Sequence, residues 1–266
     1  MQPFHGGVFV PTMGALHDGH AALIRRAAGL AGGRAVVVSV FVNRAQFNEP
    51  SDFETYPREL EHDVALCADA GATCVFAPPE QVVYPPDAGP SSPPLPAVAT
   101  APGLEDRFRP GHFAGVWRVC ARLFDLVQPV QAIFGEKDWQ QLQLMRALAA
   151  RRGGPSIIAG PTVRDADGVA LSSRNAHLTR EQRSSARALP ASLEEAGRIN
   201  DPAAAEHAGR AVLAQAGLDV EYFAVRDAAM LEHVRAGEPA RVLAAARLGT
   251  TRLIDNMPWP GGSGTG

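Results

Sequence analysis

The sequence has no long apolar run and no strong excess of either charge. Its 266 residues contain no stretch of about 18 consecutive apolar residues, the length that a membrane-spanning helix needs. The 25 Lys and Arg residues nearly balance the 28 Asp and Glu residues, for a formal net charge of -3. A near-neutral chain lacks the basic surface that generic binding to nucleic acid or anionic membranes requires. We therefore expect no nucleic-acid partner and no membrane partner.

Cysteine and aromatic residues are also scarce. The three cysteines, Cys67, Cys74 and Cys120, lie in apolar stretches without a CxxC pattern, which favours buried thiols over disulfides or zinc ligands. Aromatic residues make up 6% of the chain, which argues against an aromatic binding face. The opening residues, MQPFHGG, lack the basic and apolar regions of a signal peptide, so we expect a cytoplasmic protein.

Short apolar runs alternate with helical periodicity in the first part of the chain. Residues 35–42, AVVVSVFV, are apolar on both faces, as in a central parallel strand covered by helices on both sides. This alternation predicts an α/β fold in which a Rossmann-like parallel sheet is joined by right-handed crossovers. Further strands are expected at residues 8–10, 73–77, 132–134 and 156–159.

Proline is concentrated in one region. Nine of the 22 prolines lie between residues 78 and 102, which predicts an exposed loop without regular secondary structure. Strand and helix patterns resume beyond this region, so it is interpreted as a loop rather than a domain linker.

The pattern changes near residue 161. Asp167-Gly168 between short apolar arms predicts a hairpin turn, and the remainder predicts Ala-rich helices with one late strand pair. Thr179 with Gln182 predicts a capping box, and Asp201 before Pro202 predicts a helix start. We place a Rossmann-like domain at residues 1–161 and a second, smaller α+β domain at residues 162–266.

The segment PTMGALHDGH, residues 11–20, lies between the first expected strand and helix, where open α/β sheets bind ligands. Its two glycines allow close backbone approach, and a helix N-terminus attracts phosphate. His17 and His20 can donate hydrogen bonds to phosphate oxygens. The alternative is that one histidine caps the helix and the other is merely exposed. The paired spacing favours the phosphate site.

Polar residues also follow two other expected strands. Asn43 and Gln46 leave the central strand and are expected to face a shared pocket, and His112 is a possible further pocket residue. Lys137 and Gln141 follow the strand at residues 132–134, and a lysine there suits phosphate. Taken alone, either residue would by default be an ordinary surface residue, but its placement at the carboxyl end of a strand favours a role in the site.

A fourth polar segment follows the expected hairpin. Ser172, Ser173 and Arg174 form a potential phosphate clamp, because serine donates single hydrogen bonds and arginine donates in pairs. The sequence contains no P-loop and no GxGxxG fingerprint, so nucleotide binding would depend on the histidine segment. A serine nucleophile paired with His17 or His20 is disfavoured, because no GxSxG elbow is present.

These segments together resemble the pantoate-β-alanine ligase family of the nucleotidyltransferase superfamily. The resemblance runs over essentially the whole chain. It is carried by PTMGALHDGH and then, in family order, by FVN-x-x-QF, YPR, HFAGV, GEKD-x-QQ and SSRN, and by a closing strand at residues 245–256. It implies that pantoate reacts with ATP to give pantoyl adenylate and pyrophosphate, and that β-alanine then displaces AMP. Magnesium, a lid role for residues 162–266, and a homodimer are implied in the same way.

The resemblance also implies roles for individual residues. Gln46 and Gln141 would bind pantoate, and Gln46 would also bind β-alanine. His20, His17 and Lys137 would be catalytic. No residue is predicted as a metal ligand, because the sequence has neither an H-E-x-x-H pattern nor a cysteine cluster. The ATP-binding residues would be Met13, Gly14, Ala15, Leu16, His17, Asp18, Gly19, His20, Gly135, Glu136, Lys137, Asp138, Val163, Leu171, Ser172, Ser173 and Arg174.

Several features depart from the family pattern. Family members usually have a further strand and helix before the first motif, whereas this chain reaches Val8 almost at once. Arg44 replaces a usual proline, and Trp117-Arg118 replaces smaller residues, so both changes are expected to reshape the pocket wall. Pro190 is expected to kink a normally continuous helix.

Two alternatives differ in their products. Another nucleotidyltransferase would transfer a nucleotidyl group to a phosphorylated acceptor, whereas the ligase ends with AMP. A non-catalytic nucleotide-binding relative would bind ATP without releasing pyrophosphate, and the intact motif residues argue against it.

Overall fold

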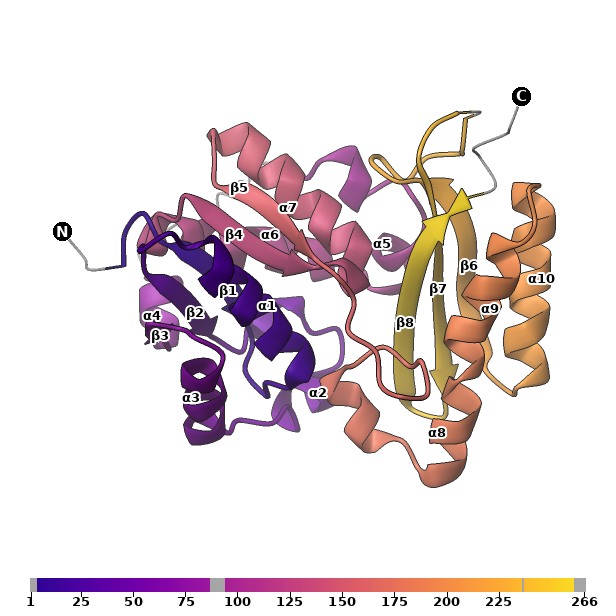
Figure 1. Ribbon diagram of the computed structural model, residues 1–266, viewed down its shortest axis with the longest axis horizontal. Helices are drawn as coiled ribbons and strands as arrows, with labels where there is room; N and C mark the ends of the chain where they lie inside the picture. The colour runs from indigo at the N-terminus through magenta and orange to yellow at the C-terminus, as the bar shows by residue number, and fades with distance from the viewer. Residues whose placement is uncertain (1–3, 87–93, 236, 261–266) are drawn as a thin grey trace. The chain divides into compact units, whose positions relative to one another are not determined.

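The structure is a computed structural model that describes residues 4–86, 94–235 and 237–260 (Figure 1). The chain forms two compact units. The first comprises the residues up to Glu136 together with Gln140–Pro161, and the second comprises Lys137–Trp139 together with the chain from Thr162 onward. None of the helices in the described ranges has the length and apolar content that crossing a bilayer requires.

A five-stranded parallel sheet forms the centre of the first unit, which confirms the predicted α/β class. Its strand order is β3-β2-β1-β4-β5, so the order reverses between the neighbours β1 and β4. Open α/β sheets bind ligands at the carboxyl ends of the strands beside such a reversal. The strands are β1 (Val8–Thr12), β2 (Val36–Val40), β3 (Cys74–Phe76), β4 (Gln131–Gly135) and β5 (Ser156–Gly160).

The two faces of β1 are buried against different helices. Val8 and Val10 pack with Ile24 of α1 on one face. Phe9, which points to the opposite face, makes an edge contact with Phe124 of α6 at a ring-centroid distance of 6.3 Å. Alternate burial on both faces is the packing that the apolar central strands predict, since neither face of such a strand meets water.

Helices and short 3-10 turns connect these strands. The helices are α1 (Asp18–Leu30), α2 (Pro50–Glu54), α3 (Leu60–Asp69), α4 (Glu80–Val83), α5 (Glu105–Phe108), α6 (His112–Val127) and α7 (Trp139–Arg152). The 3-10 turns are η1 (Arg44–Gln46), η2 (Ala97–Ala99) and η3 (Glu136–Asp138).

The prediction of no regular structure between residues 78 and 102 was wrong in part. Helix α4 and turn η2 both form there. The prolines bracket these short elements, because Pro79 is the N-cap of α4 and Pro96 is the N-cap of η2. A proline just before a helix removes no helical hydrogen bond. The densest prolines, at residues 90–94, fall largely outside the described residues.

The second unit contains an antiparallel sheet covered by helices. Helices α9 (Ala188–Gly197) and α10 (Pro202–Gln215) lie side by side against the sheet β6-β7-β8 (Figure 1). Its remaining helical elements are η4 (Ser173–His177) and α8 (Arg180–Ala186). The strands are β6 (Asp219–Asp227), β7 (Ala240–Leu248) and β8 (Thr251–Trp259).

The prediction of one late strand pair was incomplete, because three strands form. Residues 245–256, expected to be one closing strand, are the end of β7, a tight turn and most of β8. Gly249 makes the turn with a φ of 59°, and Leu248 pairs with Thr251 across it. The middle strand β7 carries Ala244, Ala245 and Ala246, residues with low strand propensity that are held in the sheet by complete burial.

Pro190 lies where the helical pattern of the second unit is interrupted. Helix α8 ends at Ala186, and α9 begins at Ala188, so Pro190 occupies the third position of α9. Its ring prevents the chain from running on as one helix from α8, and the first turn of α9 needs no donor at this position.

Gly209 offers a test of packing in the second unit. A Cβ at this α10 position would lie 2.0 Å from Cζ of the buried Phe223. We expect Gly209→Ala to lower the free energy of unfolding by about 1–3 kcal/mol, as overpacking does. At Gly197, in α9, the added Cβ would meet only Cδ of Pro260 at 3.9 Å.

Gly197→Ala is therefore the matched control and should be neutral or slightly stabilising. Urea unfolding monitored by circular dichroism measures both variants. Equal stability of the two would contradict the packing argument.

Candidate functional site

The loop that follows β1 has an unusual backbone. Gly14 has a φ of 83° and Ala15 a φ of 51°, although a side chain such as that of Ala15 disfavours this left-handed region by about 1–2 kcal/mol. The Thr12 hydroxyl donates to the Ser39 carbonyl at 2.6 Å and accepts from the Gly14 N–H at 3.2 Å. Strain of this kind persists only where the surroundings hold it, and it is frequent at functional sites.

Asp63 of α3 holds this loop from outside it. Its carboxylate accepts from the Ala15 N–H at 3.1 Å and from the Leu16 N–H at 2.8 Å. The side chain is 1% exposed, and a Cβ at Gly14 would come within 2.8 Å of it, so only glycine fits beside this carboxylate. Sequence reasoning missed Asp63, because it lies 47 residues from Leu16 and no local pattern marks it.

His17 and His20 form a reciprocal cap at the start of α1. Nδ1 of His17, the N-cap residue, accepts from the Gly19 N–H at 3.1 Å. Nδ1 of His20 accepts from the His17 N–H at 3.3 Å, and the two ring centroids are 4.2 Å apart. A neutral imidazole that accepts through Nδ1 carries its proton on Nε2. Both rings therefore present an Nε2–H donor at a helix N-terminus, so capping and anion recognition are compatible here.

Asn43 and Gln46, predicted to face a shared pocket, are joined by a directional hydrogen-bond chain. Nδ2 of the buried Asn43 donates to the Gly115 carbonyl at 3.1 Å and to Oε1 of Gln46 at 3.0 Å. Because a backbone carbonyl can only accept, the orientation of the Asn43 amide is fixed, and that of Gln46 follows. The Gln46 NH2 group then faces Met13, with Nε2 2.9 Å from its Sδ.

Tyr84 completes this chain. Its hydroxyl donates to Oδ1 of Asn43 at 2.8 Å. Burial raises the pKa of the Tyr84 phenol to about 12 despite the nearby Arg118, so the phenol stays protonated as a donor. The Arg118 guanidinium stacks 4.7 Å from the Tyr84 ring centroid, whereas Trp117 is buried in α6. Arg118, which departs from the family pattern, thus contacts Tyr84, at the end of the hydrogen-bond chain away from Gln46.

The backbone of Gln46 is held as well. Its carbonyl oxygen lies 2.9 Å from Nδ1 of His112, which is buried, and 3.5 Å from a guanidinium nitrogen of Arg109. The possible pocket residue His112 therefore acts on Gln46. Arg44 is exposed and stacks over the ring of Phe53 at 5.2 Å.

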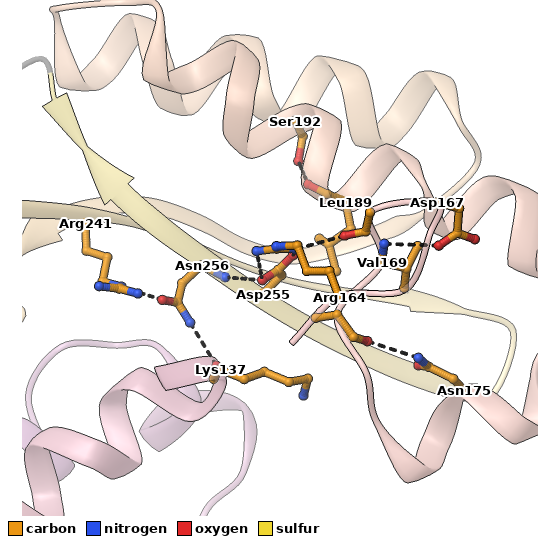
Figure 2. Close-up of polar contacts among 12 residues, drawn as sticks. Lys137, Arg164, Asp167, Val169, Asn175, Leu189, Ser192, Arg241, Asp255 and Asn256 are labelled. Carbon is orange, nitrogen blue, oxygen red and sulfur yellow. Dashed lines mark hydrogen bonds and ion pairs between the residues drawn. The ribbon is translucent and has the colours of Figure 1, made fainter. Parts of the chain in front are cut away.

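The segment after β4 divides between the two units. Lys137 and Trp139 belong to the second unit, where the Lys137 carbonyl accepts from Nδ2 of Asn256 at 2.8 Å (Figure 2). Gln140 belongs to the first unit, and its amide bonds to the Val98 carbonyl and to Asp106. Gln141, in the first turn of α7, is only partly buried.

The segment Ser172–Arg174 opens the 3-10 turn η4 at the end of a hairpin. Leu171 N–H donates to the Val163 carbonyl at 2.9 Å, which brings these two expected nucleotide-site residues together. The Ser172 hydroxyl accepts from the Arg174 N–H at 3.3 Å, and Asn175 Nδ2 bonds the Ala170 carbonyl at 3.0 Å. These two bonds tie the turn to the residues just before it.

The cysteines and acidic residues bear on two other chemistries. All three cysteines are free thiols, and burial raises the pKa of Cys120 to about 12 and that of Cys67 to about 11, which makes both poor nucleophiles. Among the described residues, no group of three or more His, Cys, Asp or Glu side chains is arranged to hold a metal ion.

A 3-2-1-4-5 parallel sheet with a histidine-capped helix after β1 is a doubly wound α/β fold, here of a nucleotidyltransferase-like kind. Residues 5–258 match the family described as pantoate-beta-alanine ligase. The chain belongs to this family.

Relatives and solved structures agree with this assignment. A pantothenate synthetase of Acidothermus cellulolyticus is 47% identical in an alignment 264 positions long that covers 94% of this chain and 84% of the relative. One of Rhizorhabdus wittichii is 49% identical, over 93% of this chain and 89% of the relative. The crystal structure of pantothenate synthetase from Thermus thermophilus matches with a TM-score of 0.88 and 40% identity, over 96% of this chain and 94% of that chain.

A further solved structure carries ligands. Pantoate-beta-alanine ligase from Francisella tularensis, complexed with beta-gamma ATP and beta-alanine, matches with a TM-score of 0.79 and 33% identity. The match covers 96% of this chain and 90% of that chain.

Replacement of Asp63 tests the support of the loop. An asparagine has one acceptor oxygen, and its NH2 group would face the second backbone N–H. We expect Asp63→Asn to lower the free energy of unfolding by about 1–3 kcal/mol, the cost of leaving a buried donor without an acceptor. The amides of Ala15 and Leu16 should also exchange with solvent faster, as measured by NMR.

Asp69→Asn is the control, because Asp69 is an exposed acid of the same helix. If exchange at Ala15 and Leu16 were the same in both variants, Asp63 would not be what holds the loop.

Proposed function

We propose that this protein is a pantoate-β-alanine ligase that makes pantothenate from pantoate, β-alanine and ATP through a pantoyl adenylate. Membership of the family supports the reaction. The observation that carries the proposal is the pair of Nε2–H donors of His17 and His20 at the N-terminus of α1, on a loop held by Asp63. Such a group suits the phosphates of a nucleotide.

In the first step, a carboxylate oxygen of pantoate attacks the α-phosphorus of ATP. A new O–P bond forms, the bond from the α-phosphorus to the bridging oxygen breaks, and pyrophosphate leaves with the bond electrons. His17 and His20 donate hydrogen bonds to oxygens whose negative charge increases in the transition state. We assign Lys137 and Ser172–Arg174 to the same task of offsetting phosphate charge.

The remaining nucleotide contacts are assigned from the motif segments. Met13–Asp18 and Gly19 would line the nucleotide site from the first unit, and Gly135 and Glu136 would do so from the end of β4. Asp138, Val163 and Leu171 complete the proposed set.

Gln46 and Gln141 are assigned to pantoate. The hydrogen-bond chain from Tyr84 gives Gln46 a fixed orientation in which its NH2 group is the presented end. An NH2 donor suits the oxygens of pantoate, and an uncharged amide leaves the carboxylate nucleophilic.

In the second step, the β-alanine amine attacks the acyl carbon of the adenylate. The C–N bond forms, the bond from the acyl carbon to the phosphate oxygen breaks, and AMP leaves while the amine loses a proton. Gln46 is proposed to serve this step too. The acyl carbon that is attacked is the former carboxylate carbon of pantoate, one of whose oxygens became bonded to phosphorus in the first step.

Magnesium is proposed to accompany the nucleotide. The described residues offer no cluster of three metal-binding side chains, so the donors present do not fit a dedicated protein cage. Mg²⁺ commonly retains several waters and is bound through phosphate oxygens, where it shields their charge. No step of the mechanism is assigned to it.

Three further expectations remain proposals. A cytoplasmic location is supported by the three free thiols, which are typical of reducing compartments. The homodimer and the lid role of residues 162–266 rest on the family resemblance.

Activity is the direct test. Purified protein incubated with ATP, pantoate, β-alanine and magnesium should form AMP and pantothenate in equal amounts. Without β-alanine, it should release about one pyrophosphate per active site, because the adenylate accumulates. Folded protein that binds ATP but releases no pyrophosphate would show a non-catalytic relative, and transfer of AMP to a phosphorylated acceptor would show a different nucleotidyltransferase.

His20 separates capping from chemistry. We expect His20→Ala and His20→Asn both to slow adenylate formation about a hundredfold to a thousandfold, as removal of a transition-state donor does. Asparagine offers an oxygen near the place of Nδ1 and so retains the cap, whereas alanine removes it. His62→Ala, an exposed position on α3, is the control. Near wild-type rates in His20→Asn would limit His20 to capping.

A further inference from the structure

The backbone of Lys137 and the side chain of Trp139, two residues further along, are both held within the second unit. Its carbonyl accepts from Nδ2 of Asn256 at 2.8 Å, and Oδ1 of Asn256 accepts from Nε of Arg241. The Arg241 guanidinium lies 3.6 Å from the ring centroid of Trp139, whose Nε1–H donates to the Ala228 carbonyl at 2.9 Å. The residues on both sides of Asp138 are therefore held by one sheet. Figure 2 shows the bonds that join Lys137, Asn256 and Arg241.

Asp255 makes a comparable attachment to the second phosphate segment. Its carboxylate receives two bonds from the Arg164 guanidinium, at 2.6 and 2.9 Å. Arg164 also donates to the Gly168 carbonyl at 3.0 Å and pairs with Ala170 across the hairpin. This hairpin leads directly into Ser172–Arg174. Asp255 is 2% exposed, so its carboxylate is largely removed from water. Two parallel hydrogen bonds between a guanidinium and a carboxylate make a strong ion pair.

Strand geometry explains how two consecutive residues reach two segments. Successive side chains of a strand point to opposite faces of the sheet. Leu253 and Met257 pack with the core beneath α9 and α10, and Asp255 shares their face. Asn256 therefore points to the other face, where Arg241 of β7 lies diagonally opposite in the register.

We propose that Asp255 and Asn256 are positioning residues of the ligase. Asn256 fixes the backbone of Lys137, and Asp255, through Arg164, fixes the hairpin that carries Ser172–Arg174. The two segments that we assign to the phosphates are thus set by one dipeptide of β8 rather than by two independent loops. This inference rests on the proposed function, because it assumes that both segments act on ATP.

Asn256→Asp is the first test. An aspartate can still accept from Arg241 but cannot donate to the Lys137 carbonyl. We expect kcat for adenylate formation to fall about tenfold to a hundredfold, the scale of a misplacement near 1 Å. In a Lys137→Ala background, the same change should reduce kcat less than about twofold, because the group that it positions is gone.

Asp255→Asn is the second test, with Arg174→Ala as its background. We expect the same pattern, a large loss alone and little further loss in the Arg174→Ala protein. The crossed pair, Asn256→Asp with Arg174→Ala, should retain most of the Asn256 effect. This cross separates positioning of a given segment from a general loss of activity.

Glu221→Gln is the matched control. Glu221 of β6 pairs with Arg247 and Arg252 at 2.7 Å each, so the change weakens an ionic network in the same sheet without touching either segment. The backbone amide shift of Asp138, which shares a peptide group with the Lys137 carbonyl, should move in Asn256→Asp and stay in place in Glu221→Gln. Circular dichroism confirms folding, and Asn256→Ser replaces Asn256→Asp if the latter does not fold.

Different failures have different meanings. An inactive wild-type protein would defeat the proposed function. An active wild type in which Asn256→Asp costs the same factor with and without Lys137, or no more than Glu221→Gln, would overturn the positioning role of Asn256. Full additivity of Asp255→Asn with Arg174→Ala would overturn that of Asp255.

Discussion

The buried carboxylate of Asp63 is the constraint on which the first half of the site depends. Its two oxygens accept from consecutive backbone N–H groups, Ala15 and Leu16, at 3.1 and 2.8 Å. Hydrogen bonds to a charged acceptor contribute about 1.5–3 kcal/mol each, enough to offset the cost of the left-handed Ala15. With the loop held, His17 falls at the N-cap of α1 and His20 one turn later. The direction of both imidazoles therefore follows from a residue outside the motif.

A backbone carbonyl plays the corresponding part for Gln46, the glutamine proposed to bind pantoate. A side-chain amide alone can be turned either way, but the Gly115 carbonyl accepts only, so it orients Asn43, which then orients Gln46. The close approach needs a glycine, since a Cβ at Gly115 would lie 2.3 Å from the Ala45 carbonyl oxygen. The orientation of Gln46 thus depends on the packing between α6 and η1, which no sequence pattern in either segment indicates.

The parts of the fold that could be predicted are those that depend on near neighbours. The β-branched run at β2, the Thr179 capping box and the turn at Gly168 are local, and the structure contains all three. The order of the motifs also indicated the family. The supports of the site could not be found in this way, because Asp63 acts across 47 residues and Asn256 acts across 119. A hydrogen bond between residues far apart in the sequence produces no periodic pattern, so its donor and acceptor can be identified only in the folded structure.

The near-neutral charge of the chain is consistent with the proposed mode of phosphate recognition. A basic surface attracts any polyanion, and its contribution weakens as salt screens it over about 8–10 Å. Imidazole, amide and hydroxyl donors have no such reach, so they act only on an oxygen at hydrogen-bond distance and in the right direction. Their contribution to phosphate binding then depends on how rigidly the donors are positioned. Asp63, Asp255 and Asn256 are polar side chains at 1–3% exposure, and the Gly115 carbonyl can only accept. In the proposed site, a few donors held by these groups, together with the charges of Lys137 and Arg174, take the place of a basic surface.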